Sequence, residues 1–423
     1  MANTVYIVSA VRTPIGKFGG MLMDFTQPDL AVIAVRAALE RAFGSPLPSE
    51  RTPGQPLAGN SPQLPWHVDE LIFGNARPAG VGPNPARQIA WRAGLGDDVP
   101  AFTVNAACAS GLRSVMLSWQ QILLGEAHIM VAGGAESMSR VPYLVDGRWG
   151  FKMGNQPLID AMYRDGFLCP ISKLIMGETA EVLAVDYKLA REEQDAYAVE
   201  SHRRATRAAA EGRFQAEIVP IDKTDKKGVV TRLAHDEHVR PDVTLEGLAK
   251  LPPVFSKTGT VTAGNSSGLT DGASAVVLVS EQKVRELKLT PLARIVDATV
   301  TAVDPRVMGI GPVPAVRKLT QRTGTKVEDY AAVELNEAFA AQVLACDRDL
   351  HFNRERMNPH GGAIALGHPI ACTGARILTT LVHELRQPSG PAGQKASSVA
   401  GRRGLATLCV SGGLGVAVEI ETV

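Results

Sequence analysis

The chain has 423 residues, a formal net charge of +1, 45% apolar residues and 21% charged residues. This length suffices for two or three domains or one large duplicated domain, and the composition is typical of a globular protein. The near-zero charge argues against a nucleic-acid-binding protein, and no apolar run approaches the roughly 20 residues of a membrane span.

Short β-type runs alternate with helical patterns along the chain. The predicted strands are residues 5–10, 70–73, 102–108, 129–132, 275–280, 292–300 and 332–335, followed by a hairpin of 405–410 and 416–420. The predicted helices are residues 30–43, 85–93, 112–123, 191–214, 311–322, 338–350 and 377–385. Such alternation favours parallel sheets covered by helices.

Two segments, 45–66 and 387–401, are rich in Pro, Gly, Ser or Ala and indicate inserted loops, to which no function is assigned. The N-terminus lacks the pattern of a secretory signal. The five cysteines are scattered without metal-site spacing. We therefore expect a reduced cytoplasmic protein without a metal ion.

The segment around Cys108, Thr103 to Gly111, is the most informative part of the chain. A β-type run leads into small residues and then into a helical pattern, so Cys108 is expected at the amino end of a helix. Unpaired N–H groups and the helix dipole there favour thiolate over thiol, which predicts a nucleophile. The alternative for a cysteine in this setting is a small buried side chain.

Five further sequence blocks complete the pattern. In chain order the six blocks are NAACASG (105–111), MGETAE (176–181), VTAGNSSGLTDGA (261–273), ELNEAFA (334–340), GGAIALGHP (361–369) and CVSGGLG (409–415). With these blocks the chain resembles the thiolase family, the acetyl-CoA acyltransferases, over nearly its whole length.

The resemblance implies an α/β fold with five layers, α-β-α-β-α, made of two similar halves. The N-terminal half would comprise 1–138 and 269–288, an inserted loop domain 139–268, and the C-terminal half 289–423. A faint internal echo agrees with duplication, since ACASGLR (107–113) is similar to ACTGAR (371–376).

The resemblance also implies catalytic roles. Cys108 would hold the acyl group, and His368 would take the thiol proton. Cys409 would act as acid and base on the carbon beside a second thioester. Asn336 would hold a water against the first oxyanion, together with His368. The backbone N–H of Ser411 would belong to an oxyanion hole, although the family usually has glycine there.

Two neighbours are expected to support these residues: Glu337 would orient the side chains around it, and His360 would support its loop. By family position, Ser267 would hydrogen-bond a pantetheine amide of coenzyme A, and Phe339 would pack on the pantetheine arm. Arg240 would lie by the adenine and phosphates. The residues expected to line the slot are Met176, Leu251 and Phe255. Leu251 and Phe255 have the alternative of being ordinary core residues.

The activity implied is reversible acyl transfer between coenzyme A thioesters, as part of fatty acid metabolism. Coenzyme A would be substrate and product rather than a bound cofactor, and the protein would form a dimer or tetramer. Ile175 stands where short-chain biosynthetic thiolases often carry histidine, which weakens any inference that acetoacetyl-CoA is the preferred substrate.

Two other functions were weighed. A β-ketoacyl synthase shares the fold but uses Cys-His-His, which the Cys409 block and the Gly-His-Pro of His368 disfavour. A non-catalytic binder of lipids or acyl carriers would have lost Cys108, His368 or Cys409, and none is lost.

Overall fold

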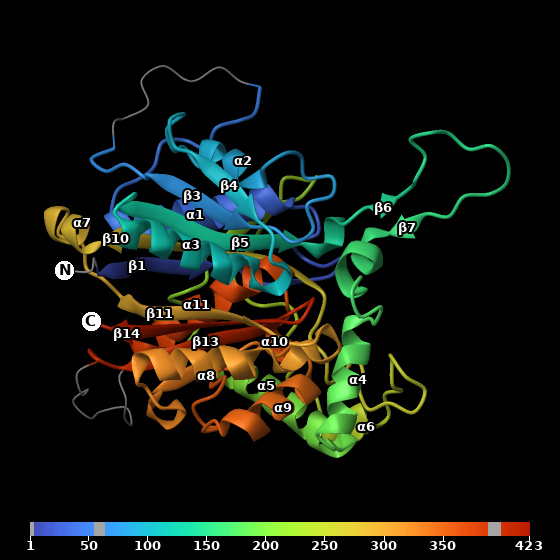
Figure 1. Cartoon of the computed structure of the whole chain (residues 1–423). Helices are drawn as coiled ribbons and strands as arrows, with labels where there is room; N and C mark the ends of the chain where they lie inside the picture. The colour runs from blue at the N-terminus through green and yellow to red at the C-terminus, as the bar shows by residue number, and fades with distance from the viewer. Residues whose placement is uncertain (1–3, 55–63, 388–398) are drawn as a thin grey trace.

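The computed structural model describes residues 4–54, 64–387 and 399–423, so both predicted insertions, 45–66 and 387–401, lie partly outside the described residues. The described strands include a mixed ten-stranded sheet that runs through the whole molecule (Figure 1). No helix in these three ranges is long and apolar enough to cross a membrane.

The sheet has two halves that differ in the part of the chain they use. The first half has the order β1 (Val5–Arg12), β10 (Thr270–Ser280), β5 (Ile129–Ser137), β3 (Glu70–Gly74), β4 (Ala101–Val104), with β2 (Gly16–Lys17) on β10. The second half has the order β11 (Ala293–Ala302), β14 (Leu414–Thr422), β13 (Arg403–Val410), β12 (Ala332–Leu335). The halves meet where Tyr6 and Ile7 of β1 pair with Arg294 and Ala293 of β11.

The expectation of parallel sheets is wrong for most of the strand pairs. Only β3 with β4, β3 with β5 and β12 with β13 are parallel. Strand β10 returns after a long excursion and runs antiparallel to both β1 and β5. Strands β13 and β14 form a hairpin, as predicted, whose turn uses Gly412 and Gly413 at φ of +89° and +84°. Such angles favour glycine because it has no Cβ.

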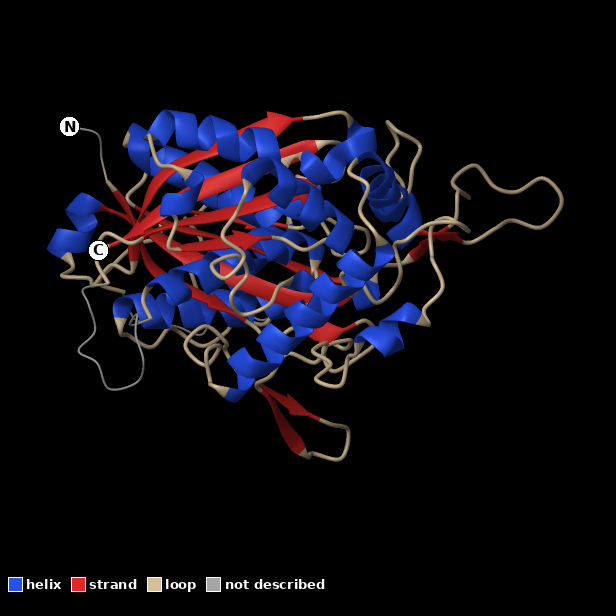
Figure 2. Cartoon of the chain, turned by 90° about the horizontal axis from the view of Figure 1, so that it is seen from below, coloured by secondary structure: helices blue, strands red, loops and turns tan. Residues whose placement is uncertain are grey.

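Helices cover and separate the two halves. Helices α1 (Gln27–Phe43) and α2 (Pro85–Arg92) lie outside the first half, and α8 (Pro312–Thr323) and α9 (Ala340–Leu350) lie outside the second (Figure 1). Helices α3 (Ser110–Leu124) and α11 (Ile370–Leu385) pack against each other between the halves. The five layers expected from the sequence are therefore present, and the view from below shows helices around the strands (Figure 2).

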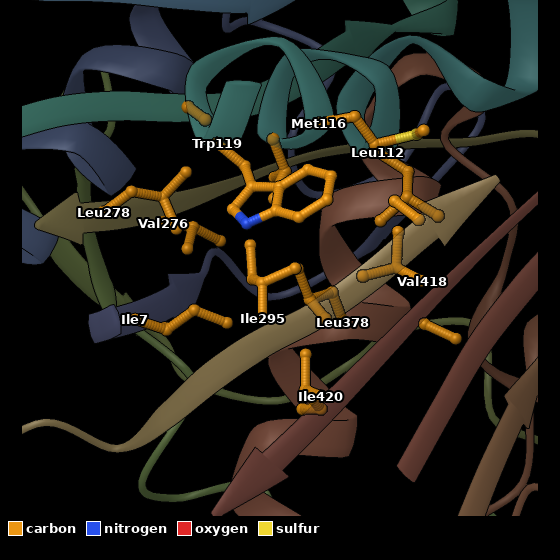
Figure 3. Close-up of a cluster of buried hydrophobic side chains, with 14 of the residues drawn as sticks. Ile7, Leu112, Met116, Trp119, Val276, Leu278, Ile295, Leu378, Val418 and Ile420 are labelled. Carbon is orange, nitrogen blue, oxygen red and sulfur yellow. The ribbon is translucent and has the colours of Figure 1, made fainter. Parts of the chain in front are cut away.

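The main core lies between the two halves of the sheet. Trp119 and Leu112 of α3 point into it, and Leu378 of α11 joins them (Figure 3). Side chains from both halves complete this cluster, including Val276, Leu278, Val418 and Ile420 (Figure 3). Because α11 lies between the two halves of the sheet, almost all of its residues are buried, including polar ones such as Thr379 and Arg376.

The chain between η2 (Met138–Arg140) and β10 contributes no strand to the described part of the large sheet. Its elements are β6 (Tyr143–Leu144), β7 (Ile159–Asp160), η3 (Tyr163–Phe167), α4 (Met176–Asp186), α5 (Arg191–Ala210), β8 (Ile221–Thr224), β9 (Val230–Leu233) and α6 (Leu245–Ala249). The loop between β6 and β7 extends away from the body (Figure 1). The division at residues 139 and 268 stays a prediction.

Candidate active site

A cavity of about 470 Å³ brings together segments from all parts of the chain. It is lined by eight of the residues singled out in the sequence: Cys108, Met176, Phe255, Ser267, Phe339, His368, Cys409 and Ser411. Leu251, Arg240 and Asn336 are not among its lining residues. Asn336 is buried, with only 1% of its surface exposed.

Cys108 lies in a tight turn between strand and helix. Strand β4 ends at Val104, four residues earlier than predicted, and a 3₁₀ turn, η1 (Ala107–Ala109), leads into α3. Ala107 has φ of +47°, a region that non-glycine residues rarely occupy. The Asn105 side chain accepts from its N–H, and the Ser110 hydroxyl donates to its carbonyl. This strained turn presents the half-buried Cys108 thiol to the cavity.

The resting state of Cys108 differs from the sequence-based expectation. Burial raises the pKa of the Cys108 thiol, although the Ser411 N–H and the charge of Arg77 both act to lower it. Removing the sulfur from water disfavours the anion more strongly than these donors and the helix end favour it. The thiol is therefore protonated at rest and needs a base.

His368 has the properties of that base. Burial, with smaller effects from the charges of Arg376 and Arg77, lowers the pKa of His368 to about 3, so the ring is neutral. Its Nδ1 lies 2.6 Å from Oγ1 of Thr373, whose hydroxyl can donate to the Pro369 carbonyl at 3.3 Å. With that hydroxyl donating to Pro369, Nδ1 carries the ring proton and Nε2 is free to accept one.

Several buried polar atoms near the site have no hydrogen-bond partner among the described residues. They are Nε2 of His368 and both side-chain polar atoms of Asn336. Buried polar groups are nearly always satisfied, so these atoms require a partner from the reacting molecules or a water. This arrangement is compatible with the predicted joint role of His368 and Asn336, which stays a prediction.

Cys409 and Ser411 come from the hairpin of β13 and β14. Cys409 is 1% exposed, and burial, with a further contribution from Cys108, raises its pKa well above the ordinary value. A thiol of this kind holds its proton until a strong base, such as an enolate, takes it. Ser411 follows in the turn and lines the same cavity, and its backbone N–H acts to lower the pKa of Cys108. The hairpin thus places one proton donor and one backbone N–H at the nucleophile.

Small residues let the two central helices approach closely at their amino ends. A Cβ on Gly111 would lie 2.6 Å from the Ala371 carbonyl oxygen, and a Cβ on Gly374 would lie 2.6 Å from the Leu112 nitrogen. Real Cβ contacts are longer, so only glycine fits at both positions. The close approach fixes Cys108, which lies just before α3, relative to the segment that carries His368.

Glu337 holds the loop that leads to His368. Its carboxylate accepts from the Tyr197 hydroxyl at 2.8 Å, the Ser201 hydroxyl at 2.7 Å, the Asn358 amide at 3.0 Å and the Ile364 N–H at 3.1 Å. His360 lies in the same loop, with Nε2 2.7 Å from Glu384 of α11. Both residues touch neighbouring side chains rather than the cavity.

Aromatic and sulfur side chains form one wall of the cavity. The rings of Phe255 and Phe339 meet edge to face, with centroids 6.2 Å apart. Phe255 also lies over Gly177, where a Cβ would be 2.2 Å from its ring. Met176 and Ser267 complete this wall. An apolar wall with isolated hydroxyls suits a narrow arm that carries amide groups.

Two residues predicted to contact coenzyme A do not line this cavity. Leu251 is partly buried and packs against a cluster that includes Leu248 and Ala340, and its contact with coenzyme A stays a prediction. Arg240 lies against His202, with its backbone N–H 3.2 Å from Nδ1 and its Nη2 3.3 Å from Nε2. Burial and the Arg240 charge lower the pKa of His202 to about 3, and a neutral ring accepts only one of these two donors.

Among the cavity-lining residues that the sequence reasoning missed are an arginine and a histidine, Arg77 and His238. Arg77 follows the carboxyl end of the parallel strand β3, a position where ligand-binding residues gather in α/β folds, and this signal was available. The ring nitrogen Nδ1 of His238 lies 3.0 Å from the Ala365 carbonyl oxygen, which can accept a hydrogen bond from it. No feature of the sequence pointed to His238 as a cavity residue. No group of His, Cys, Asp and Glu side chains in the described ranges could hold a metal ion.

A buried neutral imidazole, two thiols and a backbone N–H around one cavity define an acyl-transfer enzyme with a cysteine nucleophile. The family models described as "Thiolase, N-terminal domain" and "Thiolase, C-terminal domain" match residues 60–282 and 289–422. The chain belongs to the thiolase family and is an acyltransferase of that family.

Similar proteins extend over the whole chain. The acetyl-CoA acetyltransferase of Chromobacterium violaceum is 45% identical over 418 residues, which cover 99% of both chains. A probable acetyl-CoA acyltransferase of Staphylococcus aureus is 43% identical and covers 99% of this chain and 98% of its own. The crystal structure of human mitochondrial 3-ketoacyl-CoA thiolase in complex with CoA is 41% identical, with a TM-score of 0.88, and covers 100% of this chain and 98% of its own.

Proposed function

We propose that this protein cleaves 3-ketoacyl-CoA with coenzyme A, and catalyses the reverse Claisen condensation of acetyl-CoA, through an acyl-Cys108 intermediate. The observation that carries the proposal is the single cavity lined by Cys108, His368, Cys409 and Ser411. The side chains of the three residues Cys108, His368 and Cys409 supply a nucleophile, its base and a second proton donor, and the backbone N–H of Ser411 supplies an oxyanion donor.

In the first half of cleavage, His368 Nε2 takes the proton of the Cys108 thiol, and the thiolate attacks the 3-keto carbon. The oxygen becomes an oxyanion, for which the Ser411 N–H and the protonated His368 are the proposed donors. The bond between the second and third carbons then breaks. Its electron pair forms the enolate of acetyl-CoA, which takes a proton from Cys409. Acetyl-CoA leaves, and the acyl group stays on Cys108 as a thioester.

In the second half, coenzyme A gives its thiol proton to the Cys409 thiolate and attacks the acyl-Cys108 carbonyl. The tetrahedral intermediate collapses, acyl-CoA is released, and the Cys108 sulfur takes its proton back from His368. Every group returns to its starting state, so coenzyme A acts as a substrate and no bound cofactor is proposed.

Mass spectrometry of the intact protein after incubation with acetyl-CoA tests this proposal. We expect one acetyl adduct on Cys108, and none in Cys108→Ala. Production of acetoacetyl-CoA by the same sample would accompany it. Absence of both adduct and product, with coenzyme A still bound, would favour the non-catalytic binder considered above.

We also propose that the protein forms a homo-oligomer through the segment between β6 and β7. Trp149 and Met153 in this segment are 94% and 93% exposed, and they lie in a loop that extends from the body (Figure 1). Such apolar exposure supports burial against another copy of the chain. Light scattering should give a smaller particle for Trp149→Ser/Met153→Ser than for the unchanged protein. Equal masses would contradict the proposal.

The cytoplasm is the proposed location, and fatty acid metabolism the proposed context. All five cysteines are free, and two of them, Cys108 and Cys409, are proposed to work as thiols, which requires a reducing compartment. Fractionation of cells that express the tagged protein would test the location.

A further inference from the structure

Arg77 is a buried guanidinium that the mechanism above does not use. It is 8% exposed and lines the cavity together with Cys108. Among the described lining residues it is the one permanent cation, since burial lowers the pKa of both His368 and His238 and keeps those rings neutral. A single buried charge at a reaction cavity demands a partner.

The side chain uses few of its donors. Nη1 donates to the Ala76 carbonyl at 3.0 Å, and Nε is buried with no hydrogen-bond partner among the described residues. Nε and Nη2 lie over Gly166, where a Cβ would be 2.7 Å from either nitrogen. A guanidinium has five N–H donors, and leaving these donors without hydrogen bonds in a buried site is unfavourable.

No carboxylate of the described chain neutralises this charge by contact. The Arg77 charge acts to lower the pKa of the buried Glu136, but Glu136 forms no ion pair with Arg77 within 4.0 Å and is occupied by other donors. Its carboxyl group accepts from the Asn75 amide at 2.7 Å and from the N–H groups of Ala76, Arg77 and Ala371 at 3.1 to 3.2 Å. Arg77 thus depends on something other than Glu136 for its hydrogen bonds.

The two cavities that Arg77 lines also lack acidic side chains among their described lining residues. Arg77 lines the main cavity and a neighbouring one of about 390 Å³. Neither has an Asp or Glu among its described lining residues. On the side of the main cavity Arg77 lies with Gly166, Tyr163 and Phe167, which come from η3. Phe255 and Ser267, which also line the main cavity, belong to the wall proposed for the pantetheine arm.

We propose that Arg77 selects the acyl group by binding a carboxylate at the end of the acyl chain that is farthest from the thioester. The preferred substrate is then the coenzyme A thioester of a 3-oxo dicarboxylic acid. This inference rests on the proposed thiolase activity. The planar fork of arginine matches a carboxylate with two parallel hydrogen bonds, whereas an alkyl end would leave the guanidinium unpaired. The site therefore favours the charged end and disfavours the apolar one.

The test is the ratio of kcat/KM for cleavage of 3-oxoadipyl-CoA to that of 3-oxohexanoyl-CoA. These substrates have the same number of acyl carbons and differ only in a terminal carboxylate against a methyl group. We expect the unchanged protein to prefer 3-oxoadipyl-CoA by roughly 30-fold or more, because a buried charge pair is lost with the other substrate. Arg77→Leu should abolish or reverse this preference, and Arg77→Lys should keep part of it.

The ratio separates selection from other effects of the charge. The Arg77 charge also acts to lower the pKa of both Cys108 and His368, so its loss changes the chemistry of both substrates alike. Arg164→Leu is the matched control, because its side chain is 51% exposed and does not line the cavity. It should keep the original ratio.

Several results would overturn the inference. If the unchanged protein prefers 3-oxohexanoyl-CoA, or cleaves both substrates equally well, the inference is wrong. This result needs no variant, so it holds even if Arg77→Leu fails to fold. An equal loss on both substrates in Arg77→Leu would assign the residue a purely electrostatic role. Acetoacetyl-CoA separates the two proposals: its cleavage without a carboxylate preference refutes the role of Arg77 alone, whereas no cleavage of any substrate refutes the thiolase activity as well.

Discussion

Helices α3 and α11 lie together in the middle layer, and each has a cysteine at its amino end (Figure 1). Cys108 precedes α3 and is half-buried at the cavity, whereas Cys372 in the first turn of α11 is 1% exposed and does not line it. Burial raises the pKa of both thiols, that of Cys372 to about 12. A helix amino end is therefore not enough to make a cysteine reactive.

The two positions differ in what surrounds the sulfur. The Ser411 N–H acts to lower the pKa of Cys108, which shares its cavity with His368. Cys372 is enclosed by the helix packing, where Gly374 and Gly111 bring the helices together. Access to a base and to substrate, rather than local backbone geometry, distinguishes the nucleophile from its counterpart.

The largest expected effect is the difference in kcat between two single variants, Cys108→Ala and Cys372→Ala. Cys108→Ala should lower kcat by at least roughly 10⁴-fold, since the covalent route is lost. Cys372→Ala is the matched control and should leave kcat within about twofold while costing about 1–2 kcal/mol in stability for a small cavity. Steady-state kinetics and urea unfolding measure both. Comparable losses of kcat in the two variants would remove the contrast.

The next effect separates the two proton-transfer residues. His368→Ala should slow both half-reactions by on the order of 10²–10⁴-fold, because the base that deprotonates the Cys108 thiol is lost. Cys409→Ser should still acquire an acetyl group from acetyl-CoA and then fail to condense it, since serine is a poor acid and base at neutral pH. Rapid-quench detection of the adduct measures the first step. If Cys409→Ser blocks adduct formation but condenses a preformed adduct normally, the two roles must be exchanged.

Alkylation should show the difference between the thiols directly. Because the pKa of Cys108 is raised, its thiolate fraction grows with pH over the whole range from 7 to 9, by up to about tenfold per unit. Iodoacetamide labelling of Cys108 should therefore accelerate strongly across this range. Cys372 should stay unlabelled in the folded protein, as peptide mapping would show. A labelling rate of Cys108 that does not change between pH 7 and pH 9 would indicate that the thiolate is already present at rest.

The packing that joins the helices should tolerate no larger side chain. Gly374→Ala would place a Cβ 2.6 Å from the Leu112 nitrogen and should destabilise the protein by about 2 kcal/mol. Gly247→Ala is the control, because a Cβ there would meet only the Thr244 hydroxyl, at 3.3 Å. Urea unfolding compares the two. A Gly374→Ala protein as stable as the control would show that the helices can separate without loss.

The smallest expected effect concerns Arg240, which lies outside the cavity. If it contacts the nucleotide end of coenzyme A, Arg240→Ala should raise KM several-fold with little change in kcat, because an exposed contact with phosphate is worth roughly 1 kcal/mol. The effect should shrink as salt is added. Acetyl-pantetheine lacks the nucleotide and is the control substrate. Equal impairment with it would mean that Arg240 instead supports the loop through His202.

The amino-acid sequence determined the local elements and the chemistry they carry. Helix and strand patterns predicted most elements, including the hairpin of β13 and β14, since periodicity and turn residues act over short distances. The sequence blocks also led to Cys108, His368 and Cys409, which the structure brings to one cavity. These blocks are readable because each groups small residues and a reactive side chain within a few positions.

The tertiary structure alone decided the properties that depend on distant parts of the chain. The protonated resting state of Cys108 and the enclosure of Cys372 both follow from burial by segments far away in sequence. The antiparallel course of β10 and the unpaired guanidinium of Arg77 follow from how those segments meet. Burial and pairing set ionisation and access, and neither can be read from the neighbouring residues alone.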